Sequence, residues 1–214
     1  MNKDDTLYNT DDRVLKINNE IIELVKKTIS GKGDSDKHLA TFFSIALGQG
    51  LKNILELGVR NGDTTLPLLL AAYINNGKVT SVDLNQTNFT PDPKLKKHWN
   101  FVKQDAIQFL ESVDIKDKFD LVYLDDWHAY DHVKRELELL DKLIHPGSII
   151  LVHDLMYGRT EPYYHADLSV KKGQWAKGGP YRAICELDDN FWEFATLPYN
   201  NGLTILRKKY SSKY

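Results

Sequence analysis

Residues 54–65 read ILELGVRNGDTT, an apolar run that passes through a turn into a polar segment. The run predicts a buried strand, and Gly58 and Gly62 predict a tight turn where the backbone can approach a ligand. A helix is expected to begin near Asp63. This order of strand, glycine turn and helix is typical of the ligand-binding end of an open α/β sheet.

The spacing of the two glycines limits the class of ligand. Dinucleotide-binding turns carry the pattern G-x-G-x-x-G, but here Arg60 stands where the middle glycine would be. No lysine follows as in a phosphate-binding loop, so the turn disfavours a pyrophosphate. Glu56, two residues before Gly58, instead favours a ligand that carries positive charge.

Strand and helix patterns alternate along the chain around this turn. The predicted strands are 53–57, 78–82, 99–102, 119–124 and 148–152, and the predicted helices between them are 63–75, 106–112 and 130–143. Nearly wholly apolar strands fit a parallel sheet covered by helices on both faces. Two further runs, 191–196 and 203–207, flank an Asn-Gly pair and predict a hairpin. The expected fold class is α/β: a Rossmann-like, doubly wound, mostly parallel seven-stranded sheet with a C-terminal antiparallel hairpin.

The chain divides into an extension and one larger domain. Residues 1–36 are interpreted as a leader and a helical extension, and 37–214 as the domain that carries the sheet. The helix expected over 14–29 has an apolar stripe that must be buried, either by capping the site or as the seam of a homodimer. Residues 155–180 are too long for a simple connector and are predicted to form a lid or substrate loop.

Composition excludes several functional classes. The chain has 214 residues, a formal net charge of −2 and a single cysteine, Cys185. These values argue against a disulfide framework, a multi-cysteine zinc site and a basic surface for nucleic acid. The polar, acidic start does not resemble a secretory signal, and no apolar run could span a membrane. We therefore expect a soluble cytoplasmic protein without nucleic-acid or membrane partners, in which Cys185 packs in the core.

Four further motifs follow the glycine turn in a fixed order. Asp83 ends the second strand, and the later segments are FDLVYLD at 119–125, DDWHAY at 125–130 and PGSIILVHD at 146–154. Together with E-L-G-x-x-x-G at 56–62 they resemble the class I S-adenosylmethionine-dependent methyltransferases, in particular a subgroup of small O-methyltransferase-like proteins with D-G-x-H-x-Y and H-D segments. The resemblance implies methylation of an oxygen atom on a small-molecule or sugar-like acceptor, with S-adenosyl-L-methionine as cofactor.

The resemblance also implies roles for individual residues. Glu56 would lie near the methionyl amino group and Gly58 under the cofactor, while the backbone from Arg60 to Gly62 would line the methionine and ribose. Three aspartates have the remaining roles. Asp83 would accept hydrogen bonds from the ribose hydroxyls, and Asp105 would accept one from the adenine amino group. Asp125 would face the sulfonium and the methyl acceptor. Asp105 has an alternative role as the N-cap of the helix at 106–112, and both roles can coexist.

Proton removal from a hydroxyl acceptor needs a base near the strand ends. Asp125, His128, His153 and Asp154 are the candidates, and His128 is preferred because imidazole titrates near neutrality. Asp125 and Asp154 end neighbouring strands and could together hold Mg²⁺, with Asp126 or His128 completing the site. Metal-dependent relatives usually carry a further Asp or Asn after the second of these aspartates, where this chain has Leu155.

Two other functional classes remain open at this point. A nicotinamide-dependent oxidoreductase would use the same fold, although the missing middle glycine argues against it. A non-catalytic cofactor-binding module would leave Asp125, His128 and Asp154 without a chemical task, and fold alone does not exclude it.

Overall fold

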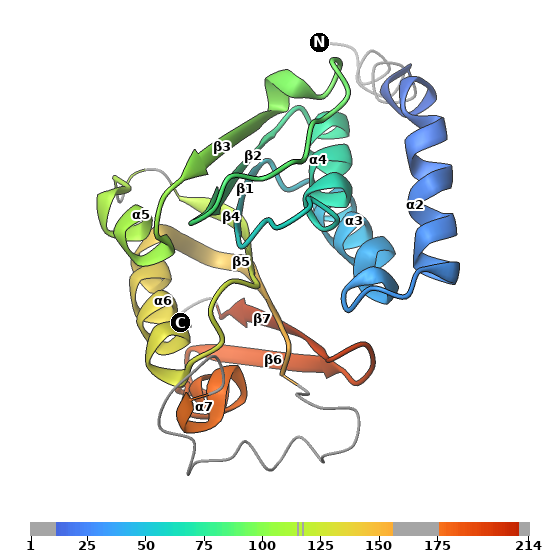
Figure 1. The fold of residues 1–214 in the computed structure, drawn as a ribbon. Helices are drawn as coiled ribbons and strands as arrows, with labels where there is room; N and C mark the ends of the chain where they lie inside the picture. The colour runs from blue at the N-terminus through green and yellow to red at the C-terminus, as the bar shows by residue number, and fades with distance from the viewer. Residues whose placement is uncertain (1–11, 115, 117, 156–175, 210–214) are drawn as a thin grey trace.

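The structure is a computed structural model that describes residues 12–114, 116, 118–155 and 176–209. One sheet of seven strands runs through the molecule in the order β3-β2-β1-β4-β5-β7-β6 (Figure 1). The strands are β1 (Asn53–Leu57), β2 (Lys78–Asp83), β3 (Trp99–Lys103), β4 (Phe119–Leu124), β5 (Ile144–His153), β6 (Trp192–Leu197) and β7 (Leu203–Lys208). The first five pair in parallel, and β7 runs antiparallel to both β5 and β6. The predicted fold class is confirmed.

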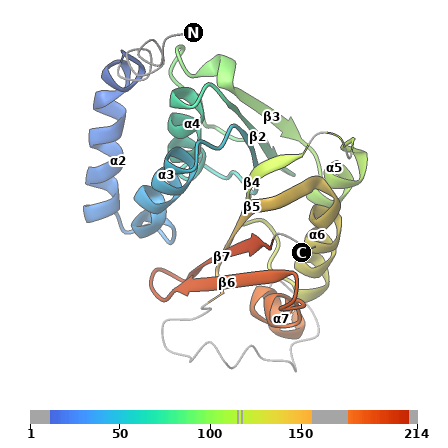
Figure 2. The same ribbon diagram turned by 180° about the vertical axis from the view of Figure 1, so that it is seen from behind.

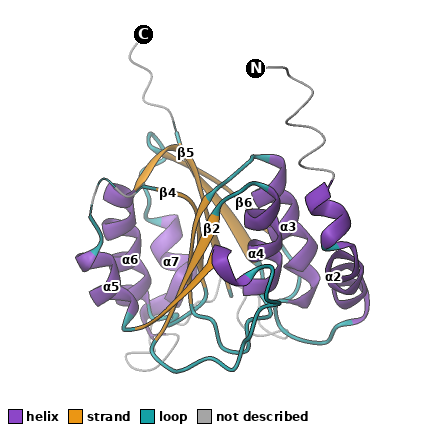
Figure 3. Ribbon diagram, turned by 90° about the horizontal axis from the view of Figure 1, so that it is seen from above, coloured by secondary structure: helices purple, strands orange, loops and turns teal. Residues whose placement is uncertain are grey.

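Helices cover both faces of the sheet (Figure 3). One face carries α2 (Asn18–Ser30), α3 (Leu39–Gly48) and α4 (Thr65–Ile74), and the other carries α5 (Ala106–Ser112), α6 (Tyr130–Leu143) and α7 (Gly179–Cys185). Short 3₁₀ turns are formed by Asp36–His38, Lys96–His98 and Ala176–Gly178. Along β1, Ile54 packs into the first layer of helices, whereas Leu55 and Leu57 pack into the second. This alternation explains why the strand is apolar at nearly every position.

The strand order reverses between β1 and β4, and this reversal positions the loops that follow them. Leu57 and Leu124 lie opposite each other at the carboxyl ends of the two strands. Beyond them, the N–H of Asp125 donates to the Leu57 carbonyl at 2.9 Å, and the N–H of Gly58 donates to the Val82 carbonyl at 2.9 Å. The turns that follow β1, β2 and β4 therefore converge at one edge of the sheet, seen from both sides in Figures 1 and 2.

The predicted first helix is present as α2, which packs against α3 and the 3₁₀ turn before it. Its inner face buries Ile17 and Leu24. A second apolar stripe stays exposed and consists of Ile22, Val25 and Ile29 on α2 and of Leu15 in the helical turn before it. The helix thus has more apolar surface than the fold covers. Among the described residues, no helix is long and apolar enough to cross a membrane.

Some expectations need correction or lie outside the described residues. Cys185 is exposed at the end of α7, not packed in the core, because Ala183 and Ile184 are the residues that turn inward there. The fifth strand begins at Ile144 rather than at 148 and continues through Pro146. Of the predicted leader and lid, residues 1–11 and 156–175 lie outside the described ranges, and the domain boundary at residue 37 stays a prediction.

The two-layered core gives a first stability prediction. Leu121 lies at the centre of β4 with 0% of its surface exposed. We expect Leu121→Ala to lower the free energy of unfolding by about 2–5 kcal/mol, because it removes buried methyl groups and leaves a cavity. Chemical denaturation followed by circular dichroism measures this. Leu15→Ala, at a position with 69% exposure, is the matched control and is expected to change stability by less than about 0.5 kcal/mol.

Candidate active site

A cavity of about 420 Å³ opens at the carboxyl ends of β1, β2 and β4. Five of the predicted cofactor-binding residues line it: Gly58, Arg60, Asp83, Asp105 and Asp125. Two others, Glu56 and Gly62, do not. The structure therefore brings together residues that are up to 67 positions apart in the sequence, from Gly58 to Asp125, as expected for a switch point in an α/β sheet.

Gly58 is required by the close approach of two backbones. Its φ angle is +89°, and a Cβ atom at this position would lie 2.3 Å from the carbonyl oxygen of Asp125. Any other residue would have to push the end of β4 away from β1. The glycine predicted to lie under a ligand thus also sets the distance between the two strand ends.

Asp83 organises the turn after β1. One carboxylate oxygen accepts the backbone N–H groups of Val59 at 2.9 Å and Arg60 at 3.1 Å, and the other accepts that of Asn85 at 2.8 Å. A carboxylate offers about four acceptor positions, so three are used by the fold. Asp83 also lines the cavity, so the remaining acceptor position is available for a ligand hydroxyl.

The structure confirms one of the two roles predicted for Asp105, that of a helix N-cap. Its carboxylate accepts the N–H of Gln108 at 3.0 Å and caps the start of α5. The same residue lines the cavity, so the adenine role stays compatible with the cap.

Glu56 is buried outside the cavity lining, within the sheet. Its carboxylate accepts hydroxyl groups from Thr64 at 2.8 Å, Thr65 at 2.7 Å and Ser81 at 2.6 Å. Burial raises its pKa to about 7, although the three hydroxyl hydrogen bonds act in the opposite direction. If Glu56 acts on the methionyl amino group, it does so from this buried position behind the cavity lining.

The carboxylate of Asp125 collects three donors. One oxygen accepts the hydroxyl of Tyr123 at 2.9 Å, and the other accepts Nε2 of His128 at 3.2 Å and Nδ1 of His153 at 3.3 Å. Burial alone would raise the pKa of Asp125, but the hydrogen bonds from His128 and His153 outweigh it and lower the pKa. Asp125 is therefore a fixed anion that orients both imidazoles.

His153 is held as a cation, with 0% of its side chain exposed. Its Nε2 faces the carbonyl oxygen of Asn200 at 3.1 Å, and its Nδ1 faces carboxylate oxygens of Asp125 at 3.3 Å and Asp154 at 3.2 Å. Because both nitrogens face acceptors, both carry hydrogen. Burial disfavours this charge, yet the hydrogen bond and the charge of Asp125 raise the pKa of His153 to about 9.

His128 and Asp154 complete the cluster. Nε2 of His128 lies 3.4 Å from Asp154, in addition to its bond to Asp125. Asp154 has a φ angle of +62°, and one of its carboxylate oxygens is buried without a hydrogen-bond partner among the described residues. Burial raises the pKa of Asp154. One ligand atom from each of Asp125, His128 and Asp154 falls within a 4.8 Å cluster, and the unsatisfied oxygen together with this donor set fits a divalent cation.

Several residues that line the cavity carry no role predicted from the sequence. They include Leu84, Asn85, Trp127 and His132, whereas Asp126, which also lines the cavity, was predicted only as a possible third metal ligand. Trp127 is 48% exposed and offers an aromatic surface. Its position inside the 125–130 motif is the sequence signal that could have identified it as a cavity residue. His132 sits in the first turn of α6, where helix periodicity does not reveal which side chains face a cavity.

Comparison with known proteins identifies the region. Residues 55–155 match a family model described as a methyltransferase domain. This match confirms, for residues 55–155, the methyltransferase resemblance given by the motifs at the strand ends.

Solved structures show the same fold around this methyltransferase domain. A Bacillus cereus O-methyltransferase in complex with SAH has a TM-score of 0.60 and 16% identity, over 87% of this chain and 89% of that one. The SAH-bound Podospora anserina methyltransferase PaMTH1 gives 0.59 and 20%, over 88% and 87%. MycE from the mycinamycin biosynthetic pathway, in complex with Mg, SAH and mycinamycin VI, gives 0.61 and 17%, over 89% of this chain and 55% of MycE.

One curated relative is similar over about half of the chain. The chain is 29% identical over 121 residues to the tRNA N(3)-methylcytidine methyltransferase trm140 of Schizosaccharomyces pombe. That alignment covers 52% of this chain and 38% of the relative, so the chain corresponds to well under half of that protein.

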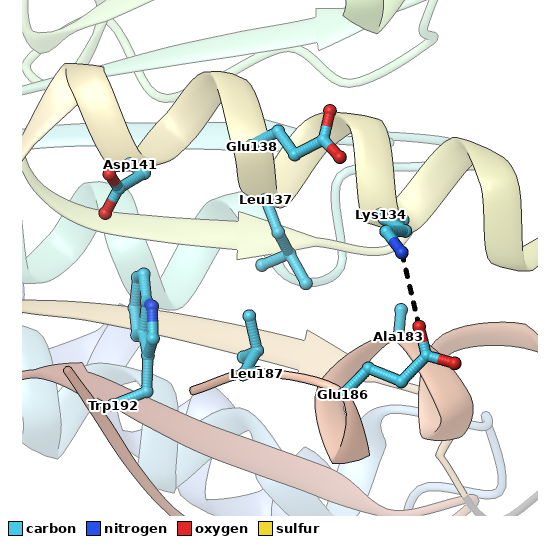
Figure 4. Close-up of a pocket in the computed structure, with 8 residues that line it drawn as sticks. All are labelled: Lys134, Leu137, Glu138, Asp141, Ala183, Glu186, Leu187 and Trp192. Carbon is cyan, nitrogen blue, oxygen red and sulfur yellow. Dashed lines mark hydrogen bonds and ion pairs between the residues drawn. The ribbon is translucent and has the colours of Figure 1, made fainter. Parts of the chain in front are cut away.

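Another hollow lies between α6 and the segment that runs from α7 into β6 (Figure 4). Its volume is about 310 Å³, and its apolar wall includes Leu137, Leu187 and Trp192. An ion pair between Lys134 and Glu186 at 3.3 Å lies along its edge. None of the predicted site residues lines it.

The buried Glu56 predicts a pH-dependent stability. Its pKa of about 7 in the folded protein lies above the ordinary value of 4.5. The contribution of this carboxyl group to folding stability is therefore fully present below about pH 4.5 and is lost as the pH rises through 7. We expect the free energy of unfolding of Glu56→Gln, relative to wild type, to rise by roughly 3 kcal/mol between pH 4.5 and 8. Urea denaturation at several pH values measures this.

The exposed Glu23 gives the matched control, because Glu23→Gln should show no such slope. Equal slopes for Glu56→Gln and wild type would show that Glu56 does not carry this proton.

Proposed function

We propose that this methyltransferase acts on a hydroxyl oxygen of a small-molecule or sugar-like acceptor. The observation that carries the proposal is the hydrogen bond between His128 Nε2 and Asp125 at 3.2 Å, beside the cavity at the switch point. A hydroxyl acceptor must lose a proton, whereas many other nucleophiles need no base. His128 does not itself line the cavity, but Asp125, to which it is bonded, does, and an imidazole oriented in this way suits that task.

The charge of the cavity lining supports S-adenosyl-L-methionine as the cofactor. Four carboxylates line it, from Asp83, Asp105, Asp125 and Asp126, and a cationic ligand would be favoured there. When bound, the cofactor supplies an activated methyl group on its sulfonium. The chain would position it through the acceptor capacity of Asp83 and Asp105, the close backbone passage at Gly58, and the turn from Arg60 to Gly62.

The two histidines of the cluster divide the proton chemistry. The hydrogen bond between His128 Nε2 and Asp125 at 3.2 Å orients the imidazole that we propose as the base for the acceptor's proton. Asp125 fixes the ring and stabilises the imidazolium that results. His153 already carries its proton in the resting protein, which makes it a positioning residue for Asp125 and Asp154 and not a base.

A divalent cation such as Mg²⁺ could be held by Asp125 and Asp154, with His128 as a third ligand. Such an ion would lower the pKa of a bound acceptor hydroxyl and orient it. The metal-containing MycE complexes lend support by analogy of fold alone. If the ion is required, treatment with a chelator should abolish turnover and added Mg²⁺ should restore it. Unchanged turnover after chelation would leave His128 as the sole device for proton removal.

The tRNA relative defines the main alternative acceptor. The formal charge of −2 and the acidic cavity lining argue against binding of a polyanion, and we propose that no nucleic acid is involved. The nicotinamide alternative loses its basis with the methyltransferase match and with Arg60 in the glycine turn. A cytoplasmic location, and a homodimer through the exposed stripe of α2, remain part of the proposal.

Cofactor binding provides the first test. We expect wild type to bind S-adenosyl-L-methionine with micromolar affinity by isothermal titration calorimetry. Asp83→Ala should weaken binding at least about tenfold, because it removes a charged acceptor and loosens the turn after β1. Asp189→Ala, at an exposed position far along the chain, is the control that should bind like wild type. Absence of binding to wild type would contradict the proposal.

Turnover with a labelled methyl group provides the second test. His128→Ala should retain cofactor binding but lose about 10²–10⁴-fold in rate, since it removes the base. His145→Ala, at a half-exposed histidine bonded to Asp120, should keep full activity. The acceptor panel consists of hydroxylated aromatics, glycosides and total tRNA. Methyl label on tRNA cytidine, or an unchanged rate in His128→Ala, would overturn the assignment to a hydroxyl acceptor.

A further inference from the structure

A second cluster of ligating side chains lies between the loop after β4 and α6. It consists of Asp126, which follows β4, and of His132 and Glu136 on α6. Nε2 of His132 lies 2.9 Å from Asp126 and 3.5 Å from Glu136. One ligand atom from each residue falls within a 4.8 Å cluster. The spacing of four residues on α6 places His132 and Glu136 on the same face of the helix.

Glu136 is the observation that points to a ligand. The side chain has 0% exposure, and neither of its carboxylate oxygens has a hydrogen-bond partner among the described residues. Buried carboxylates without partners are costly and rare in folded proteins. The other two members of the cluster line the cofactor cavity, so this buried group sits directly behind its wall.

The imidazole alone does not satisfy the two carboxylates. The same nitrogen, Nε2, faces both Asp126 and Glu136, and a single N–H can point well at only one of them. A divalent cation between the three atoms would use the Nε2 lone pair and one oxygen from each carboxylate.

We propose that Asp126, His132 and Glu136 bind a divalent transition-metal ion in the wall of the cofactor cavity. One imidazole and two carboxylates suit Zn²⁺, Mn²⁺, Fe²⁺ or Co²⁺, whereas Mg²⁺ prefers oxygen ligands and retains several waters. The site shares no residue with the cluster of Asp125, His128 and Asp154. It would tie the loop that carries Trp127 to α6, and the ion's remaining coordination positions would be open to the cavity.

The test uses the metal alone and the full chain without an affinity tag. Chelator-treated protein is titrated with Co²⁺, whose visible spectrum reports nitrogen and oxygen coordination, and with Zn²⁺ by calorimetry. The background is Asp154→Asn, which disables the other candidate metal cluster. In this background we expect one ion per chain to bind, and Zn²⁺ to raise the melting temperature.

Adding Glu136→Gln to this background should weaken binding at least about tenfold and remove the thermal shift, because the variant loses one anionic ligand and keeps its shape. Glu138→Gln, at an exposed position of the same helix, is the matched control and should bind like the background protein. Asp126→Asn gives an independent readout should the buried substitution impair folding. Absence of binding in the Asp154→Asn background, or binding that survives both Glu136→Gln and Asp126→Asn, would overturn the site.

Discussion

The carboxyl end of the sheet depends on the contacts of Asp125. The backbone N–H of Asp125 continues the pairing of β4 with β1. Its carbonyl oxygen lies so close to Gly58 that no side chain fits between the strands. Its side chain accepts hydrogen bonds from Tyr123, His128 and His153. One residue thus links the turn after β1, the buried face of β4 and the end of β5.

This arrangement places a paired set of charges behind His128. His153 is buried between two carboxylates and a carbonyl oxygen, and Asp125 raises the pKa of its imidazole to about 9. The hydrogen bonds from the two histidines in turn lower the pKa of Asp125, and the Asp125 carboxylate fixes the ring of His128. The burial that makes a lone charge costly here makes the paired set rigid.

Much of the fold could be predicted because strands covered on both faces are apolar throughout, and helices reveal themselves by their spacing. The strand ends were predicted for the same reason: a polar residue such as Asp83 or Asp125 directly after such a run has to lie at the edge of the sheet. Side-chain direction was not predictable by these means. Glu56 lies within a strand, and only the structure shows that three hydroxyls surround it in place of a ligand. Cys185 was misplaced because a helix of seven residues gives too little periodicity to assign its buried face.

The two candidate metal clusters begin at adjacent residues, and this adjacency has a physical consequence. Asp125 turns toward His153 and Asp154 at the β5 end of the sheet, while Asp126 turns toward His132 and Glu136 on α6. Consecutive side chains in an extended segment point to opposite sides, so a single short loop can serve both clusters. Any displacement of this loop would alter both sets of distances together. Ion binding on the α6 side would therefore restrict the position of Asp125, and through it the orientation of His128, without any direct contact between the two clusters.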